Sequence, residues 1–246
     1  MWFEKKKASQ SEHQEHILFL FPYSGGSSEV FDQMIEKLPV HISAYVFQLP
    51  GMGIRFTEPL SNDIDYILNE SLKVMNTIIN GRKFSFYGHS TVALFAYLFT
   101  LKMNPKGGRP MHLWIAAESA PHLNEFHEDP IIFTDQQIAE KLKRYGKLSD
   151  EVIHDPDFME FYYPIMRNEF SINYQLNERL KNTCLDQEFI LIHGDEDSHV
   201  KIDEILSWET YTSKSIILHR VQSGHFFIEE KAKNVAQIIC SYISDH

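Results

Sequence analysis

Phe84-Ser-Phe-Tyr-Gly-His-Ser-Thr-Val-Ala93 decides the fold, because an apolar run passes here through Gly88 and Ser90 into a segment of helical composition. A serine at such a strand-to-helix turn, a nucleophile elbow, holds its hydroxyl exposed above the carboxyl edge of a parallel sheet. The helix that follows directs backbone N–H groups toward an anion beside the serine. The stretch therefore predicts that Ser90 is a nucleophile.

Apolar runs of strand length alternate with helical segments on both sides of this turn. The alternation is typical of an α/β class fold with a mostly parallel central sheet flanked by helices. The expected strands are Ile17–Phe21, Ala44–Leu49, Phe84–Tyr87, Leu113–Ala117, Phe189–Ile192 and Ile216–Val221, and the expected helices are 64–79, 92–103 and 229–244.

No strand-like run is found between Pro121 and Asp186. Aromatic and aliphatic residues there follow helical periodicity around 134–145 and 157–175. We interpret residues 122–186 as a helical lid inserted into a single domain that covers residues 1–246. The alternative is that these helices extend the core.

Capping signals mark where the helices of this insertion begin. Thr134 followed by Gln137 has the spacing of a capping box, and Asp155 before Pro156 suits a helix start with proline at its first position. Pro164 lies inside the second segment, and a core helix would leave this kink site unexplained.

The nucleophile elbow requires an acid and then a histidine further along the chain. Asp197 follows the fifth expected strand and His225 follows the sixth, so loops carry both side chains to the sheet edge of Ser90. A neutral imidazole accepts the serine proton, and a buried carboxylate holds the ring in the required tautomer. We predict Ser90, Asp197 and His225 as the catalytic triad. Asp195 is the rival acid, although an aspartate after glycine more often bonds its own turn.

An alternation of histidine and aspartate in the same turn gives a metal site as an alternative, since these ligands suit several divalent ions. The residues are His193, Asp195, Asp197 and His199. The segment is a short turn without evident remote ligands. We therefore expect no metal and no cofactor.

Phe21-Pro-Tyr-Ser-Gly-Gly-Ser27 is a glycine-rich loop at the carboxyl end of the first expected strand. Its backbone can supply an oxyanion donor, and we predict the pair formed by the N–H groups of Ser24 and Thr91. A phosphate-binding loop is the competing function, but the Gly-Lys-Ser/Thr and GxGxxG patterns are missing. A tight turn without chemistry is the remaining alternative.

Composition excludes several classes of function. The chain has 246 residues, 43% of them hydrophobic, and a formal net charge of −11, which opposes a nucleic-acid partner. No signal-peptide or membrane-spanning stretch is found, and Cys184 and Cys240 form no CxxC pair. We expect a cytoplasmic monomer.

Taken together, these motifs resemble the type II thioesterases of nonribosomal peptide and polyketide synthesis, which have the α/β-hydrolase fold. The similarity extends over nearly the whole chain. It rests on Phe21-Pro-Tyr-Ser-Gly-Gly-Ser27, Gln48-Leu-Pro-Gly-Met-Gly-Ile-Arg-Phe-Thr-Glu-Pro59, Gly88-His-Ser90, Gly194-Asp-Glu-Asp197, Gly224-His-Phe-Phe227, Asp155-Pro156 and Pro164-Ile-Met-Arg-Asn-Glu-Phe170.

The resemblance implies hydrolysis of acyl groups from the phosphopantetheine arm of acyl or peptidyl carrier proteins, so that a stalled synthetase restarts. It implies an acyl-enzyme on Ser90 and mobile lid helices that gate the pocket. Two alternatives stay open. One is a carboxylesterase or lipase, and the other is a hydrolase-fold protein that binds acyl groups or carriers without turnover.

Two positions depart from the family pattern. Val92 stands where a glycine normally follows the nucleophile by two residues, so we expect crowding that leaves a shifted turn, a slow enzyme or an inactive site. Met52 stands where relatives carry an arginine, a change with no assigned consequence.

Carrier proteins are generally acidic, as is this chain, so their net fields repel at long range. A basic cluster in the expected lid offers a local attraction, although a solvated helix face is the alternative. Its members are Lys141, Lys143, Arg144 and Lys147.

Overall fold

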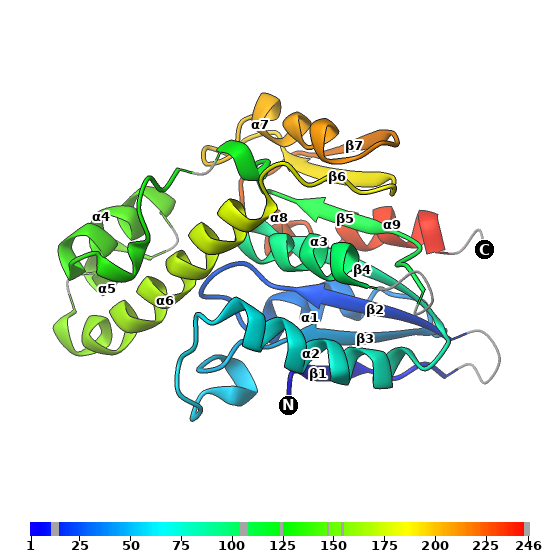
Figure 1. Ribbon diagram of the computed structural model, residues 1–246, viewed down its shortest axis with the longest axis horizontal. Helices are drawn as coiled ribbons and strands as arrows, with labels where there is room; N and C mark the ends of the chain where they lie inside the picture. The colour runs from blue at the N-terminus through cyan, green and yellow to red at the C-terminus, as the bar shows by residue number, and fades with distance from the viewer. Residues whose placement is uncertain (11–14, 104–107, 124, 147, 154, 244–246) are drawn as a thin grey trace.

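The computed structural model describes residues 1–10, 15–103, 108–123, 125–146, 148–153 and 155–243. Within them, seven strands form one sheet in the order β1-β3-β2-β4-β5-β6-β7 (Figure 1). Every neighbouring pair is parallel except β1 with β3. The strands are β1 (Phe3–Lys7), β2 (His16–Phe21), β3 (Ile42–Phe47), β4 (Lys83–His89), β5 (Leu113–Ala116), β6 (Phe189–Gly194) and β7 (Ile216–Val221).

The predicted α/β-hydrolase fold with its mostly parallel sheet is confirmed, and all six expected strands are present within two residues at either end. Strand β1 was missed, because its sequence Phe-Glu-Lys-Lys-Lys is mostly charged. β1 is an antiparallel edge strand in which Phe3 is buried opposite Phe47. Lys5 is exposed, whereas Lys6 pairs with Asp32 and Lys7 Nζ donates to the Leu38 carbonyl. Charged side chains on an edge strand oppose pairing with another molecule, which explains the weak strand signal.

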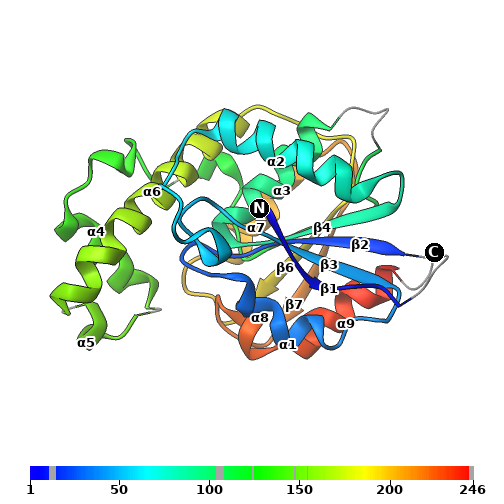
Figure 2. The ribbon, with the colours of Figure 1, turned by 90° about the horizontal axis from the view of Figure 1, so that it is seen from below.

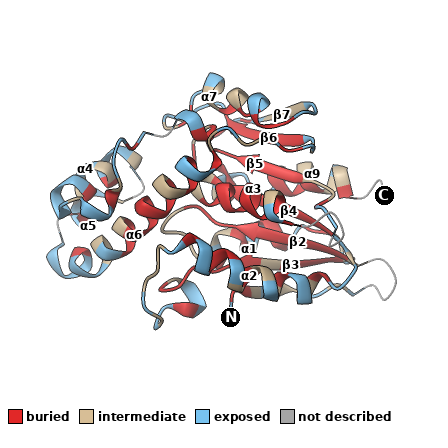
Figure 3. Ribbon diagram, in the orientation of Figure 1, coloured by how far each residue is buried: buried red, intermediate tan, exposed pale blue. Residues whose placement is uncertain are grey.

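Helices cover both faces of the sheet (Figure 2). One face packs against α2 (Ile64–Ile79) and α3 (Ala93–Lys102), and the other against α1 (Asp32–Ile35), α8 (Phe227–Glu230) and α9 (Ala232–Ile243). Because parallel strands are then buried on both sides, they are apolar without alternation, and all six residues of β2 are buried (Figure 3). The short helix α7 (Ile202–Leu206) follows β6.

The chain between β5 and β6 forms α4 (Asp135–Tyr145), α5 (Asp150–Ile153) and α6 (Pro156–Leu180). Both predicted caps are confirmed. Thr134 and Gln137 make the reciprocal bonds of a capping box, and the Asp155 carboxylate accepts from the first N–H groups of α6. α6 continues through Pro164.

Helix α6 belongs to two hydrophobic cores, and Figure 1 shows it running from α4 and α5 back to the sheet. Met159, Met166 and Phe170 pack with residues of α4 and α5, whereas Leu176 and Leu180 pack into the core above the sheet. The α4–α5 region therefore has a small core of its own, attached through one long helix. That residues 122–186 act as a lid stays a prediction.

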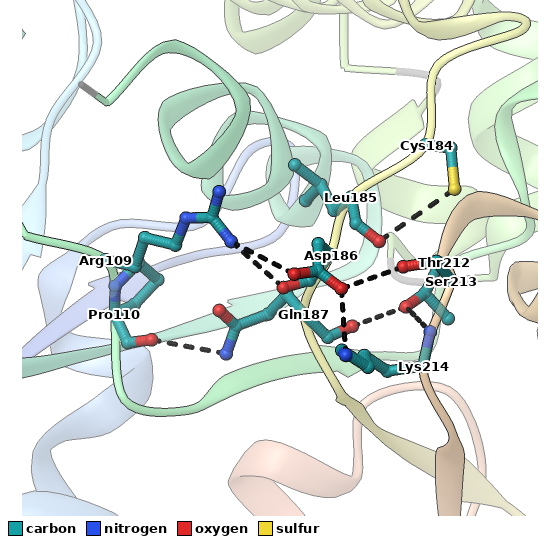
Figure 4. Close-up of polar contacts among 9 residues, drawn as sticks. All are labelled: Arg109, Pro110, Cys184, Leu185, Asp186, Gln187, Thr212, Ser213 and Lys214. Carbon is teal, nitrogen blue, oxygen red and sulfur yellow. Dashed lines mark hydrogen bonds and ion pairs between the residues drawn. The ribbon is translucent and has the colours of Figure 1, made fainter. Parts of the chain in front are cut away.

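Polar contacts tie together the amino-terminal ends of β5, β6 and β7 (Figure 4). The Asp186 carboxylate pairs with Lys214 Nζ at 3.1 Å and accepts from Ser213 Oγ at 2.9 Å, and Arg109 Nη1 donates to the Asp186 carbonyl at 3.1 Å. Lys214 and Arg109 hold the pKa of Asp186 below its usual value through hydrogen bonding and charge. Exposed pairs of this kind contribute little stability each. The candidate site lies at the opposite edge of the sheet, where the parallel strands have their carboxyl ends.

Candidate active site

The backbone at the end of β4 places Ser90 in a strained conformation. Ser90 has φ +54°, a left-handed value that is unusual for a residue other than glycine, and the chain turns there into a 3₁₀ segment and then α3. Gly88 allows this turn, because a Cβ built on it would lie 2.3 Å from Ala93 Cα. The predicted strand, turn and helix start are therefore confirmed, and the glycine at position 88 is what lets strand and helix approach so closely.

Ser90, His225 and Asp197 form one chain of hydrogen bonds. His225 Nε2 lies 2.9 Å from Ser90 Oγ, and His225 Nδ1 lies 2.8 Å from Asp197 Oδ2. Loops after β4, β6 and β7 bring these residues together, although 135 positions separate the serine from the histidine. This is the arrangement in which an imidazole takes a proton from a serine hydroxyl.

The environment of Asp197 keeps its carboxylate ionised. The side chain has no solvent exposure, and Oδ1 accepts from the N–H groups of His199 at 2.8 Å and Val200 at 3.0 Å. Burial pushes the pKa of Asp197 upward, but the bond with His225 and these N–H groups outweigh it and leave the pKa below its usual value. An ionised Asp197 accepts a hydrogen bond from the His225 Nδ1–H, which leaves Nε2 unprotonated and able to act as a base.

The rival acid, Asp195, points elsewhere. Its Oδ1 accepts from Arg220 Nε at 2.6 Å on the exposed side of the turn. His89 was not part of the predicted site. Its Nε2 lies 2.8 Å from the His225 backbone carbonyl and helps to position that residue.

In the described part of the chain, no group of three or more His, Cys, Asp or Glu side chains is arranged to hold a metal ion.

The glycine-rich loop follows β2, the strand next to β4, so it meets Ser90 at one sheet edge. Ser24 and Thr91, the predicted oxyanion donors, line the same cavity as Ser90 and His225. Asn173 of α6 donates to Thr91 Oγ1 at 2.8 Å and anchors that residue. Their assignment as an oxyanion hole stays a prediction.

Val92 does not crowd the turn in the way that the sequence led us to expect. The close approach of strand and helix falls at Gly88 and Ala93, one position further along the chain. The Val92 side chain is buried in the main core and borders a small void beside Phe47 and Met52. The valine is thus accommodated as an ordinary core residue.

A cavity of about 490 Å³ opens at Ser90 between the sheet edge and the α4–α6 region. Its wall on the side of α6 mixes Met166 and Phe170 with Asn173 and Asn177, and its wall beyond the ends of β5 and β6 is mostly polar. The lining residues used below are Ser90, Glu118, Glu125, Lys141, Tyr145 and His225. A volume of this size suits a small acyl group with part of a carrier arm.

Glu169 of α6 is hydrogen-bonded to the glycine-rich loop. Its Oε2 accepts from the Gly25 N–H at 2.7 Å, one residue after Ser24, and its side chain is buried. Gly25 has φ +76°, and a Cβ there would lie 2.5 Å from the Tyr162 hydroxyl, also on α6. The loop conformation therefore depends on this helix. Burial raises the pKa of Glu169 to about 7, although the Gly25 N–H lowers it.

Replacing Glu169 by glutamine is expected to change how stability depends on pH. The folded-state pKa, about 7, exceeds the reference value of 4.5. The stabilisation from the neutral carboxyl is therefore complete below about pH 4.5 and is lost as the pH rises through about 7, a change of about 3 kcal/mol. Urea unfolding of both proteins near both limits measures it. A wild-type minus Glu169→Gln difference that is equal at both pH values contradicts the expectation.

Sequence reasoning missed Glu169, Asn173 and His89 as parts of the site. Glu169 and Asn173 lie at helical spacing on α6 and act across 144 and 82 positions of the chain. A polar residue at a core-facing position of an amphipathic helix was the available signal.

The fold, the serine at its strained turn and the bonded histidine and aspartate define an α/β hydrolase of the serine type. The chain belongs to the thioesterase domain family, whose model matches residues 16–244. Members of this family are enzymes that hydrolyse acyl thioesters. In the described residues, no helix is long and apolar enough to cross a membrane.

Among three relatives of the chain, two are named as thioesterases and one is named as a dehydrogenase. The chain is 28% identical to linear gramicidin dehydrogenase LgrE of Brevibacillus parabrevis, over 94% of this chain and 89% of that protein. It is 26% identical to the medium-chain S-acyl fatty acid synthase thioesterase of Rattus norvegicus, over 86% and 81% respectively. The solved structure of YbtT, a type II thioesterase from the yersiniabactin NRPS/PKS pathway, superposes with a TM-score of 0.82 at 17% identity, covering 100% of this chain and 99% of that chain.

Proposed function

We propose that this protein is an editing type II thioesterase, which removes acyl groups from the phosphopantetheine arm of acyl or peptidyl carrier proteins of a nonribosomal peptide or polyketide synthetase. The observation that carries the proposal is the hydrogen-bonded chain Ser90–His225–Asp197 in a member of the thioesterase family. The medium-chain thioesterase and the type II thioesterase found among its relatives support the substrate class.

Acylation begins when Ser90 Oγ attacks the thioester carbon while His225 Nε2 takes the hydroxyl proton. The tetrahedral oxyanion collapses, the C–S bond breaks, and His225 returns the proton to the leaving thiolate. A water molecule then attacks the acyl-serine with His225 as the base, which releases the carboxylic acid and restores Ser90. Asp197 stabilises the imidazolium in both halves.

The oxyanion is stabilised, in this proposal, by the backbone N–H groups of Ser24 and Thr91. Donors fixed before the reaction cost no reorganisation when the charge develops. Two contacts from α6 support this: Glu169 bonds the loop residue after Ser24, and Asn173 bonds the Thr91 side chain. Helix α6 thus connects the proposed lid to both donors.

Only some residues of the basic cluster are proposed to contact a carrier protein. Lys141 Nζ pairs with Glu125 at 2.5 Å and lies 4.3 Å from the Phe126 ring centroid, so it faces the protein. Lys143 and Arg144 are exposed, and we propose them as the carrier contact. Lys147 lies outside the described residues. The cytoplasmic location and the monomeric state stay predictions.

Matched butyryl esters test the substrate class. With the same butyryl group on pantetheine sulfur and on its oxygen analogue, we expect kcat/KM to favour the thioester at least tenfold, which is about 1.4 kcal/mol of transition-state free energy. Stopped-time assays with purified protein measure both rates. Equal rates indicate a carboxylesterase, and labelling of Ser90 without turnover of either substrate indicates a binding protein.

A further inference from the structure

Glu118 is a buried acid in the cavity that the proposed mechanism does not use. It lies two residues beyond β5 and is 7% exposed, and its carboxyl group has no hydrogen bond or ion pair among the described residues. The Trp208 indole N–H donates to the Glu118 backbone carbonyl at 2.9 Å and fixes the residue. The preceding Ala117 has φ +52°, so the chain leaves β5 at a sharp turn.

The Glu118 carboxyl group borders the cavity, and a carboxylate in so enclosed a place is disfavoured when no donor or cation of the described residues lies against it. Burial raises the pKa of Glu118 well above its usual value, and the charges of Glu125 and Asp197 add to the effect. The group is consequently poised to ionise when a cation arrives beside it.

The nearby donors of the protein are already engaged. Lys141 Nζ pairs with Glu125, and the Tyr145 hydroxyl donates to the same carboxylate. The charges that shift Glu118 are those of Glu125 and Asp197, and Arg144, which also lines the cavity, makes no hydrogen bond or ion pair with it. A ligand in the cavity can supply the missing donor. A cation suits this place better than a neutral hydroxyl, because it also offsets the field of Glu125 and Asp197.

The position of Glu118 connects it with the acyl group. β5 lies between β4, which leads to Ser90, and β6, which leads to Asp197, and Ala116 pairs with His89. Ser90 and Glu118 line the same cavity, and the charge of Asp197 reaches Glu118, so an acyl chain attached to Ser90 extends into the space that Glu118 borders.

We infer that Glu118 is a subsite for a cationic amino group on the acyl chain, so that the cavity prefers aminoacyl thioesters to uncharged acyl thioesters of equal size. The inference rests on the proposed function and names the acyl groups that the site favours. The ammonium donates to the Glu118 carboxylate, whose own proton passes to solvent.

Isosteric pantetheine thioesters test the preference. Glycyl is paired with propionyl, and β-alanyl with butyryl and 3-hydroxypropionyl. We expect wild-type kcat/KM to favour at least one amino substrate over its methyl isostere about tenfold or more. Glu118→Gln should abolish this preference and keep propionyl and butyryl rates within about threefold. The matched control is Glu140→Gln, since Glu140 is an exposed residue of α4 outside the cavity lining.

Binding to Ser90→Ala protein separates this inference from the proposed function. Non-hydrolysable amide analogues of the same acyl groups are titrated by calorimetry, and the amino analogues are expected to bind about tenfold tighter than their isosteres unless Glu118 is also changed to Gln. Equal binding of amino and methyl analogues, an equal preference for 3-hydroxypropionyl, or a preference that survives Glu118→Gln overturns the subsite. Loss of hydrolysis on every substrate, with selective binding intact, overturns the proposed function instead.

Discussion

Ser90→Ala protein is expected to hydrolyse acyl thioesters about four or more orders of magnitude more slowly than the wild type. The substitution removes the Oγ atom that lies 2.9 Å from His225 Nε2, so no acyl-enzyme can form. Steady-state kcat on butyryl-pantetheine measures the loss, and labelling by a fluorophosphonate should disappear with it.

The size of this effect distinguishes a nucleophile from a residue that only lines the cavity. The fold should survive, because alanine at Ser90 removes one atom and relieves none of the packing below the turn. Ser213→Ala is the matched control, since Ser213 lies at the opposite sheet edge beside Asp186. Wild-type turnover in the Ser90→Ala protein, with its melting temperature unchanged, removes the nucleophile assignment.

Asp197→Asn is expected to lower kcat by about four orders of magnitude, as for other triad aspartates whose imidazole is left in the wrong tautomer. The reason is geometric. Asp197 Oδ1 accepts two backbone N–H groups, so the asparagine oxygen will occupy that position and turn its NH₂ group toward His225 Nδ1. The ring then carries its proton on Nε2 and cannot accept one from Ser90.

Asp195→Asn provides the matched control for this effect. Asp195 lies two residues earlier in the same turn and pairs with Arg220 on the exposed side. The kcat of the Asp195→Asn protein should therefore stay near the wild-type value. Comparing the two variants on one thioester, with circular dichroism to confirm folding, decides between the two acids. A large loss for Asp195→Asn and none for Asp197→Asn would reverse the assignment.

The elbow and its partners could be predicted because they depend on local signals. The sequence itself shows a glycine before the serine, a turn after each strand and the order of serine, acid and histidine. In a parallel sheet the carboxyl ends of the strands share one edge, so residues in this order lie close together. The helical insertion was equally visible, since its caps at Thr134 and Asp155 use side chains next to the backbone groups that they satisfy.

The remaining features depend on which surfaces meet, and no local pattern encodes that. Whether Val92 crowds the turn depends on a contact between Gly88 and Ala93. Glu169 reads as one polar residue on an amphipathic helix until α6 is packed against Gly25. Strand β1 was hidden by its lysines, because an edge position tolerates charge that a central strand excludes.

Helix α6 also limits how the cavity can widen. Glu169 and Asn173 hold its second half to the sheet edge, so a rigid swing of the whole helix would pull the loop bearing Ser24 and Gly25 out of position. Pro164 lacks the N–H that would bond one turn back, which weakens the helix ahead of those anchors. In the predicted lid, bulky acyl groups are expected to be admitted by bending near Pro164, because Glu169 and Asn173 anchor only the turns that follow it.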